Sequence, residues 1–365
     1  MILMNDFKAE PPELRERMLD AVHRVLDSGW YVLGNEVLSF EQQWSKACDA
    51  SFTVGVGNGM DAIEIGLRSV GIGHGDEVIT SSMTAFATVL AIIRAGAKPV
   101  LADINPSTGL LCPDSVRRCI SRRTKAVLLV HLYGQIRDME PWELLCNDTG
   151  IMLLEDCAQA HLAKWNGKIA GTFGKFGAYS FYPTKNLGCI GDGGALVTDS
   201  IDISKKAATI RNYGQSVRYY HPEQGLNSRL DEIQAALLSV RMQWLDQFTQ
   251  RRKEIGSVYN ERINNPIIEK LESPLYSENH VYHLYVIKSK ERDRLSEYLK
   301  NKGIASLIHY PVPAHKQEPC SVFNIDPVGL TNAELFASQC LSIPCHPQMS
   351  DNDVNIVIEG LNAFN

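Results

Sequence analysis

The sequence predicts an α/β protein whose large domain has a mostly parallel, seven-stranded sheet covered by helices and is followed by a smaller α+β domain. Short apolar runs alternate with amphipathic stretches through the first two-thirds of the 365 residues. Such alternation is typical of a parallel sheet with helices on both faces. The pattern changes after about Asn227, and the length suits one large domain plus a smaller one.

The candidate strands of the large domain share an apolar, β-favouring composition and short length. They are Phe52–Val56, Glu77–Thr80, Pro99–Asp103, Ala126–His131, Ile151–Glu155, Ala178–Phe181 and Ala195–Thr198. Helix-period segments such as Asp61–Val70 and Thr84–Ala95 lie between several of them.

The last third predicts a second unit. It consists of a long helix, a polar linker, a strand, a charged helix and a further strand: Arg229–Asn260, Asn264–Glu278, Val281–Ile287, Glu291–Lys302 and Ile304–Ile308. We place the domain boundary between residues 245 and 246. The N-terminal segment could pack on the small domain.

Composition excludes several classes of protein. The net charge of -6 offers no basic face for nucleic acid. The nine cysteines are odd in number and form no C-x-x-C pair, so reduced thiols in a cytoplasm fit better than a zinc ribbon or a disulfide framework, and no metal site is expected. The N-terminus lacks the features of a signal peptide, and no apolar run approaches membrane-spanning length.

Three segments carry candidate chemistry. In Val54–Ile63 a strand ends in glycines before a helix. The backbone amides at the start of that helix could bind a phosphate, or the glycines could simply form a tight turn. In Ile151–His161 an apolar strand ends at Asp156, which could be an ordinary cap or the carboxylate partner of a cofactor's pyridine nitrogen. In Gly177–Gly188 a loop holds Lys185, which could be a solvated lysine or an amine that attaches a carbonyl cofactor.

Taken together, a phosphate cradle, a carboxylate and an amine are the parts that a protein supplies to pyridoxal phosphate. At this point the chain resembles the DegT/DnrJ/EryC1/StrS sugar aminotransferases, a branch of the fold-type I pyridoxal phosphate enzymes. The resemblance extends over nearly the whole chain. Its motifs are Ser28–Gly34, Gly71–Ile79, Glu155–Gln159, Ser180–Asn186 and Gly225–Ala235.

The resemblance implies roles for the cofactor-binding residues. Lys185 would bind pyridoxal 5'-phosphate covalently and then move the proton between substrate and cofactor. Asp156 would pair with the pyridine nitrogen, and Gln159 would bond the ring hydroxyl. The backbone amides of Gly59 and Met60 and the Ser180 hydroxyl would hold the phosphate. Asn227 would reach the phosphate of the cofactor in the neighbouring subunit, which implies a homodimer with shared active sites.

The chain departs from the family's pattern in two segments. Asn58 and Met60 stand where the family usually has serine and threonine, so a hydroxyl at the phosphate turn is lost. Ala85 stands where the family places an aromatic residue over the cofactor ring, and Phe86 follows it. Either Phe86 or another side chain would cover the ring.

The sub-family resemblance favours amination of C3 of a nucleotide-linked, dTDP-type 3-keto-6-deoxyhexose by L-glutamate, for surface polysaccharide (O-antigen) or glycoside synthesis. Arg229 is the candidate for the donor carboxylate, because a guanidinium suits that anion. His309, Tyr310, Tyr31, Tyr213 and Tyr220 are candidates for the sugar pocket, and ordinary packing is the alternative for each. A C4 aminotransferase, a dehydratase that uses the same cofactor and a non-catalytic sugar-nucleotide-binding regulator are the competing functions, although Lys185 argues against a dehydratase.

Overall fold

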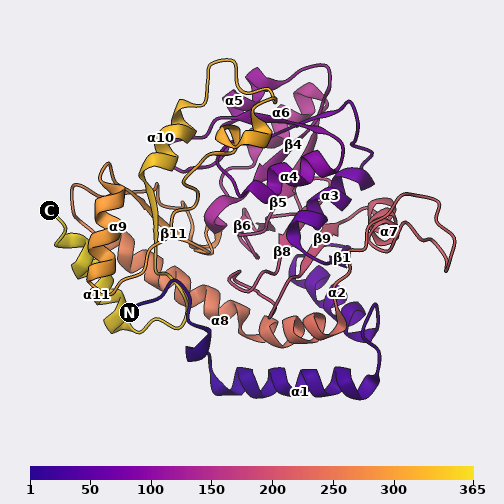
Figure 1. The fold of residues 1–365 in the computed structure, drawn as a ribbon, viewed down its shortest axis with the longest axis horizontal. Helices are drawn as coiled ribbons and strands as arrows, with labels where there is room; N and C mark the ends of the chain where they lie inside the picture. Colours follow the sequence, from indigo (N-terminus) through magenta and orange to yellow (C-terminus); the bar gives the residue numbers. More distant parts are fainter.

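The computed structural model describes residues 1–365, and a seven-stranded sheet forms the centre of its large domain (Figure 1). The strands lie in the order β1-β9-β8-β5-β4-β2-β3. Their bounds are β1 (Phe52–Val56), β2 (Glu77–Ser81), β3 (Lys98–Ala102), β4 (Thr124–Val130), β5 (Met152–Asp156), β8 (Gly177–Ser180) and β9 (Gly194–Thr198). All seven predicted strands are confirmed, with ends that differ by at most two residues. Six run parallel, and β9 pairs antiparallel with both β1 and β8.

Helices cover the sheet on both faces, as the alternation predicted. One face packs against α3 (Gly59–Ser69), α4 (Phe86–Arg94) and α7 (Ile201–Ile210). The other packs against α2 (Asn35–Ala47), α5 (Pro113–Cys119), α6 (Glu140–Thr149) and the first half of α8 (Glu232–Arg262). In β4, Ala126 and Leu128 contribute to the first core while Val127 and Leu129 contribute to the second, because successive side chains of a strand point to opposite faces.

The helix α1 (Pro12–Ser28) lies along the first half of α8 at the edge of the large domain, as Figure 1 shows. Ahead of it, the N-terminal residues reach the other unit, where Ile2 donates to the carbonyl of Gly303 and accepts from Ala305. None of the helices combines the length and the apolar character that a membrane-crossing helix needs.

The second unit is built on a three-stranded antiparallel sheet in the order β10-β11-β12. Its elements are β10 (Glu269–Lys270), β11 (Tyr285–Lys288), α9 (Arg292–Asn301), α10 (Thr331–Gln339), β12 (Cys340–Ile343) and α11 (Asp351–Asn362). Leu238 and Leu245 of α8 belong to the core of the large sheet, whereas Ile255 and Tyr259 belong to the core of this smaller sheet. The boundary between residues 245 and 246 lies inside α8 and stays a prediction.

Of the two strands predicted in this unit, Ile304–Ile308 is wrong, and Val281–Ile287 corresponds to β11 but was predicted to start four residues too early. Residues 304–308 form no strand, because Leu307 makes only a single two-bond bridge to Ser342 and Ile304 pairs with Ile2 of the N-terminus. The edge strand beside β11 is instead β12. Residues 281–284 are irregular, with Tyr282 at a positive φ of 44°, so the strand starts only at Tyr285.

Candidate active site

Lys185 lies in the loop that returns from β8 to β9, at the carboxyl edge of the parallel strands. Its backbone N–H donates to the carbonyl of Tyr182 at 2.8 Å, which folds the loop into a tight turn. Burial lowers the pKa of the Lys185 amine to about 8, and the carboxylate of Asp156 partly opposes that shift. A substantial fraction of the amine is therefore neutral and nucleophilic at ordinary pH.

Asp156 ends β5 and is held by two donors. The backbone N–H of Ala158 bonds Oδ1 at 3.0 Å, and the hydroxyl of Thr88 on α4 bonds Oδ2 at 2.8 Å. Burial raises the pKa of this carboxyl group, while the two hydrogen bonds and the nearby Lys185 and His131 act in the opposite direction. An anchored, buried carboxylate of this kind favours a cationic partner such as a protonated ring nitrogen.

Gln159 presents its amide N–H groups to the same region. Its carbonyl oxygen accepts from the backbone N–H of Tyr133 at 2.6 Å, so Nε2 is the atom that donates to the Tyr310 hydroxyl at 3.3 Å. Gln159 is thereby oriented as a donor, as its proposed bond to a ring hydroxyl requires. Tyr310 comes from the second unit, so the two units meet at this residue.

The structure brings His309 and Tyr310 into the electrostatic field of Lys185 and Asp156. Burial, followed by the charge of Lys185, lowers the pKa of His309 to about 4. Burial, followed by the charge of Asp156, raises the pKa of Tyr310 to about 12. A neutral imidazole and an intact phenol therefore stand beside the lysine, and both can hydrogen-bond an uncharged hydroxyl or carbonyl group of a substrate.

The phosphate end of the site forms where β1, β8 and α3 converge. Asn58 caps α3 by accepting from the N–H of Asp61 at 2.9 Å, which leaves the first N–H groups of the helix, at Gly59 and Met60, without an intrahelical partner. A side chain at position 59 would have its Cβ 2.6 Å from that of Ser180, so only glycine lets the helix start approach β8 this closely. Backbone amides at a helix start beside a serine hydroxyl suit a phosphate.

We call Lys185, Asp156, Gln159, Ser180 and the Gly59–Met60 turn the cofactor cluster. It combines a partly neutral amine, a buried carboxylate, an oriented amide donor and a helix N-terminus, all from one chain. These residues fit pyridoxal phosphate, which needs a group of each kind. Thr88 and Tyr133, which orient Asp156 and Gln159, were missed by the sequence reasoning. The motif Thr84-Ala-Phe-Ala-Thr88 signals Thr88 weakly, because it places two threonines one helical turn apart.

Phe86 lies at the first residue of α4 and lines a cavity of about 130 Å³ together with Thr84 and Tyr310. It packs with an apolar group that includes Val89 and Ala314. Its place over a cofactor ring stays a prediction.

The other predicted site residues are partly or fully exposed. Four belong to the loop between α7 and α8 (residues 211–231, called the arm), which projects from the body in Figure 1. Tyr213, Tyr220 and Tyr31 are 48%, 63% and 54% exposed, and Asn227 is also exposed. The guanidinium of Arg229 lies 5.5 Å from the centre of the Tyr213 ring. None of these side chains is hydrogen-bonded to a residue of the cofactor cluster.

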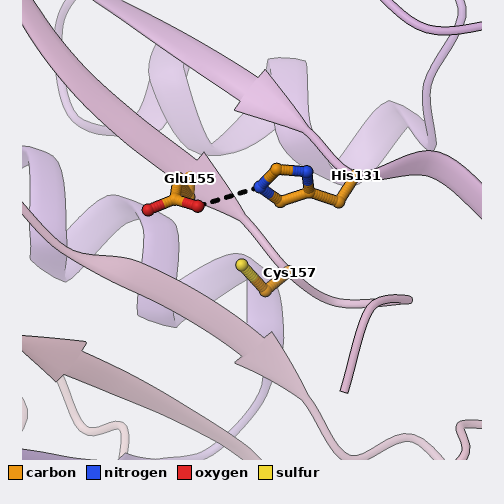
Figure 2. A group of neighbouring side chains, drawn as sticks. All are labelled: His131, Glu155 and Cys157. Atoms are coloured by element: carbon orange, nitrogen blue, oxygen red, sulfur yellow. Dashed lines mark hydrogen bonds and ion pairs between the residues drawn. The ribbon is translucent and has the colours of Figure 1, made fainter. Parts of the chain in front are cut away.

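A second polar cluster is formed by His131 and the two chain neighbours of Asp156, Glu155 and Cys157. The donor atoms of His131, Glu155 and Cys157 lie within 4.8 Å of one another, a spacing that could hold a metal ion (Figure 2). The Glu155 carboxylate, however, accepts from His131 Nε2 at 2.9 Å and from the backbone N–H groups of residues 171, 173 and 174 at 2.7–2.8 Å. Burial raises the pKa of the Cys157 thiol well above its usual range. The cluster is thus a hydrogen-bonded brace that shapes the 171–174 loop.

Comparison with known proteins identifies the family to which the chain belongs. The model of the DegT/DnrJ/EryC1/StrS aminotransferase family matches residues 12–362. The chain is 42% identical over 364 residues to the dTDP-3-amino-3,6-dideoxy-alpha-D-galactopyranose transaminase of Aneurinibacillus thermoaerophilus, covering 100% of this chain and 99% of the relative.

Solved structures agree with that match. The structure of DesV from S. venezuelae in complex with a ketimine intermediate superposes with a TM-score of 0.95 at 39% identity, covering 99% of this chain and 97% of DesV. NtdA from Bacillus subtilis with bound cofactor PMP superposes with a TM-score of 0.89 at 29% identity, covering 97% and 82% of the two chains.

Proposed function

Because the chain belongs to the DegT/DnrJ/EryC1/StrS aminotransferase family and is a pyridoxal-phosphate-dependent aminotransferase, we propose that it aminates C3 of a dTDP-linked 3-keto-6-deoxyhexose with L-glutamate as donor. The observation that carries the choice of substrate is the identity of 42% along the whole chain to a dTDP-3-amino-3,6-dideoxyhexose transaminase. A homodimer in the cytoplasm is part of the same proposal.

The chain's own residues supply three functions in this proposal. Lys185 Nζ, partly neutral because burial lowers its pKa to about 8, binds the cofactor and later carries a proton to or from the substrate carbon. Asp156 keeps the ring nitrogen protonated, and Gln159 orients the ring. When bound, pyridoxal phosphate supplies the electron sink that makes that carbon acidic.

The substrate pocket is proposed from two groups of residues. His309 and Tyr310 stand beside the cluster as uncharged hydrogen-bonding groups, which suits a sugar. Arg229 is proposed to bind the glutamate carboxylate, and Asn227 is proposed to bind the phosphate of the cofactor in the partner subunit. The exposure of the arm supports this role, since a residue that serves a partner must face out of its own chain.

The test is a panel of keto sugars offered to the purified, cofactor-loaded protein. The substrates are a dTDP-linked 3-keto-6-deoxyhexose, its 4-keto isomer and a UDP-linked 3-keto sugar, each with L-glutamate, and products are identified by mass spectrometry and NMR. Amination of the first substrate alone, or at least about tenfold faster than the others in kcat/KM, is expected. Preference for the 4-keto sugar or for the UDP-linked sugar would replace the proposed substrate. Binding without turnover of any of them would indicate a regulator.

A further inference from the structure

We propose that Asn186 and His283 are positioning residues for the neighbouring Lys185: they fasten the lysine loop to residues 281–284 of the second unit and so fix where the amine stands relative to Asp156 and Gln159. The proposal rests on the assignment of Lys185 as the cofactor-bearing lysine. Asn186 and His283 are both buried.

The contacts of Asn186 define its orientation. Its Nδ2 donates to the carbonyl of Val281 at 3.0 Å, and its Oδ1 lies 3.3 Å from Nδ1 of His283. A carbonyl oxygen can only accept, so the amide nitrogen must face Val281 and the amide oxygen must face His283. His283 therefore carries its proton on Nδ1 and donates to Asn186. Both polar groups of the asparagine are used, and both partners come from the second unit.

The same four-residue segment also holds the Gln159 side of the site. The N–H of Val281 donates to the carbonyl of Gly134 at 2.8 Å, and the N–H of Leu284 donates to that of Tyr133 at 3.3 Å. Tyr133 in turn orients Gln159. Gly134 has a φ of +95°, and a Cβ there would stand 2.8 Å from the carbonyl of Gln159 and 3.0 Å from the nitrogen of His283. One short segment thus touches the supports of both Lys185 and Gln159.

Arg252 of α8 fixes that segment from its other side. This buried guanidinium donates through Nη1 to the carbonyls of Tyr282 at 3.2 Å and His283 at 3.3 Å, and also to that of Cys345. Burial, followed by the charges of Lys185 and Arg252, lowers the pKa of His283. The neutral imidazole that the hydrogen bond requires is therefore the favoured form. A continuous hydrogen-bonded connection therefore runs from Arg252 of α8 through His283 to Asn186, the residue beside Lys185.

The experiment compares four variants with the wild type. Asn186→Ala removes both bonds, His283→Ala removes one, and His283→Asn can restore that one, because an amide nitrogen can occupy the place of Nδ1. Asn265→Ala is the matched control: Asn265 is a buried asparagine that donates to the carbonyls of Leu361 at 2.8 Å and Phe364 at 2.6 Å, among the C-terminal residues. Three quantities are measured: kcat and KM for the amino donor, the pH midpoint of cofactor attachment to the apo-protein followed by absorbance, and the thermal midpoint.

For Asn186→Ala, kcat should fall about 10- to 100-fold with KM changed less than about threefold, because misplacement of a reacting group costs rate more than binding. The pH midpoint of attachment should rise by about half a unit or more, because a loosened lysine becomes better solvated. His283→Asn should recover most of what His283→Ala loses. Asn265→Ala should lower the thermal midpoint and leave the other two quantities unchanged.

The proposal is overturned if Asn186→Ala and Asn265→Ala behave alike, or if His283→Asn is no better than His283→Ala. Should Asn186→Ala not fold, the two His283 variants decide the matter by the same criterion. Borohydride reduction and peptide mapping of the wild type distinguish an error in the assignment of Lys185 from an error in the roles of Asn186 and His283. A label on another lysine would refute the role of Lys185 itself, whereas a label on Lys185 with unchanged variants would refute only the role of Asn186 and His283.

Discussion

The cofactor cluster and the arm are built in opposite ways. In the cofactor cluster, Asp156 and Gln159 are buried and each has a hydrogen-bond partner within the chain: Asp156 has Thr88, and Gln159 has Tyr133. In the arm, Tyr213 and Tyr220 are about half exposed or more, and Asn227 is also exposed. This difference underlies our proposal that the arm acts on a neighbouring subunit, whereas the residues of the cofactor cluster orient the cofactor within their own chain. Five predictions test that contrast.

The strongest test of the cluster is Lys185→Ala. We expect transamination to fall by more than about 10⁴-fold while the fold is retained, because the variant loses both the nucleophile and the proton carrier. Activity assays and circular dichroism measure the two effects. Lys175→Ala, which removes an exposed lysine just before β8, should stay at the wild-type level. Full activity in Lys185→Ala would move the catalytic lysine elsewhere.

Asp156→Asn should retain cofactor but lose about 10²-fold or more in kcat, because an amide cannot keep the ring nitrogen protonated. Cofactor content by absorbance and steady-state kinetics give the two numbers. A kcat within about threefold of the wild type would exclude this role, since the loss of a charge partner must cost more than RT, about 0.6 kcal/mol.

The arm is tested by mixing two defective chains, Asn227→Ala and Lys185→Ala. Asn227→Ala should be impaired alone, because a phosphate oxygen loses a donor, and Lys185→Ala should be inactive. If the sites are shared, a mixed dimer has one site with both residues and one with neither. After complete subunit exchange, about a quarter of all sites should be whole, and activity should rise towards about a quarter of the wild-type value.

The control for that experiment is native mass spectrometry of the mixture, with a mass tag on one of the two chains, which reports the fraction of mixed dimers and therefore whether exchange has occurred. If exchange is complete and the two mutant chains restore nothing, the arm does not serve a neighbouring site. The proposal that the arm acts on a neighbouring subunit would then be wrong, whereas the roles proposed for the cofactor cluster would be unaffected.

Variants of Thr88 test how much the hydrogen bond from Thr88 to Asp156 contributes to kcat. Thr88→Val keeps the shape but removes the 2.8 Å bond to Asp156, and we expect about a tenfold loss of kcat, within the range of one hydrogen bond to a charged group. Thr88→Ser keeps a hydroxyl and should lose less than about threefold. Equal losses in the two variants would indicate that packing, not the hydrogen bond, matters at this position.

The smallest expected effect is on the pH dependence of cofactor attachment to Lys185. The folded-state pKa of Lys185, about 8, lies below the ordinary value for lysine of about 10.4, because burial disfavours the charged form. The rate of cofactor attachment to the apo-protein should therefore rise by up to about tenfold per pH unit below pH 8 and level off above it. A free lysine derivative should continue to gain rate up to about pH 10. A midpoint near 10 in the protein would mean that the amine is solvated.

Much of the fold could be predicted because its signals are local. The seven strands were recognised from runs of apolar residues, and the helices α3 and α4 from their periodicity. Residues 281–284 and 304–308 are equally apolar, but they were wrongly predicted as strands. What they lack is a neighbouring strand in register, which depends on how the second unit docks. The antiparallel direction of β9 likewise follows from pairing with β1 and β8, and not from its own residues.

The sequence by itself determined that the chain is an α/β protein with Asp156 at a strand end, Lys185 in a loop between strands and a glycine turn before α3, because each of these is a property of adjacent residues. Only the tertiary structure decided which distant residues complete the site. Gln159 meets Tyr310 across 151 residues, Asp156 meets Thr88 across 68, and Asn186 meets His283 across 97. Contacts of that kind arise when whole elements dock, and docking is driven by the burial of large apolar surfaces that no single short segment contains.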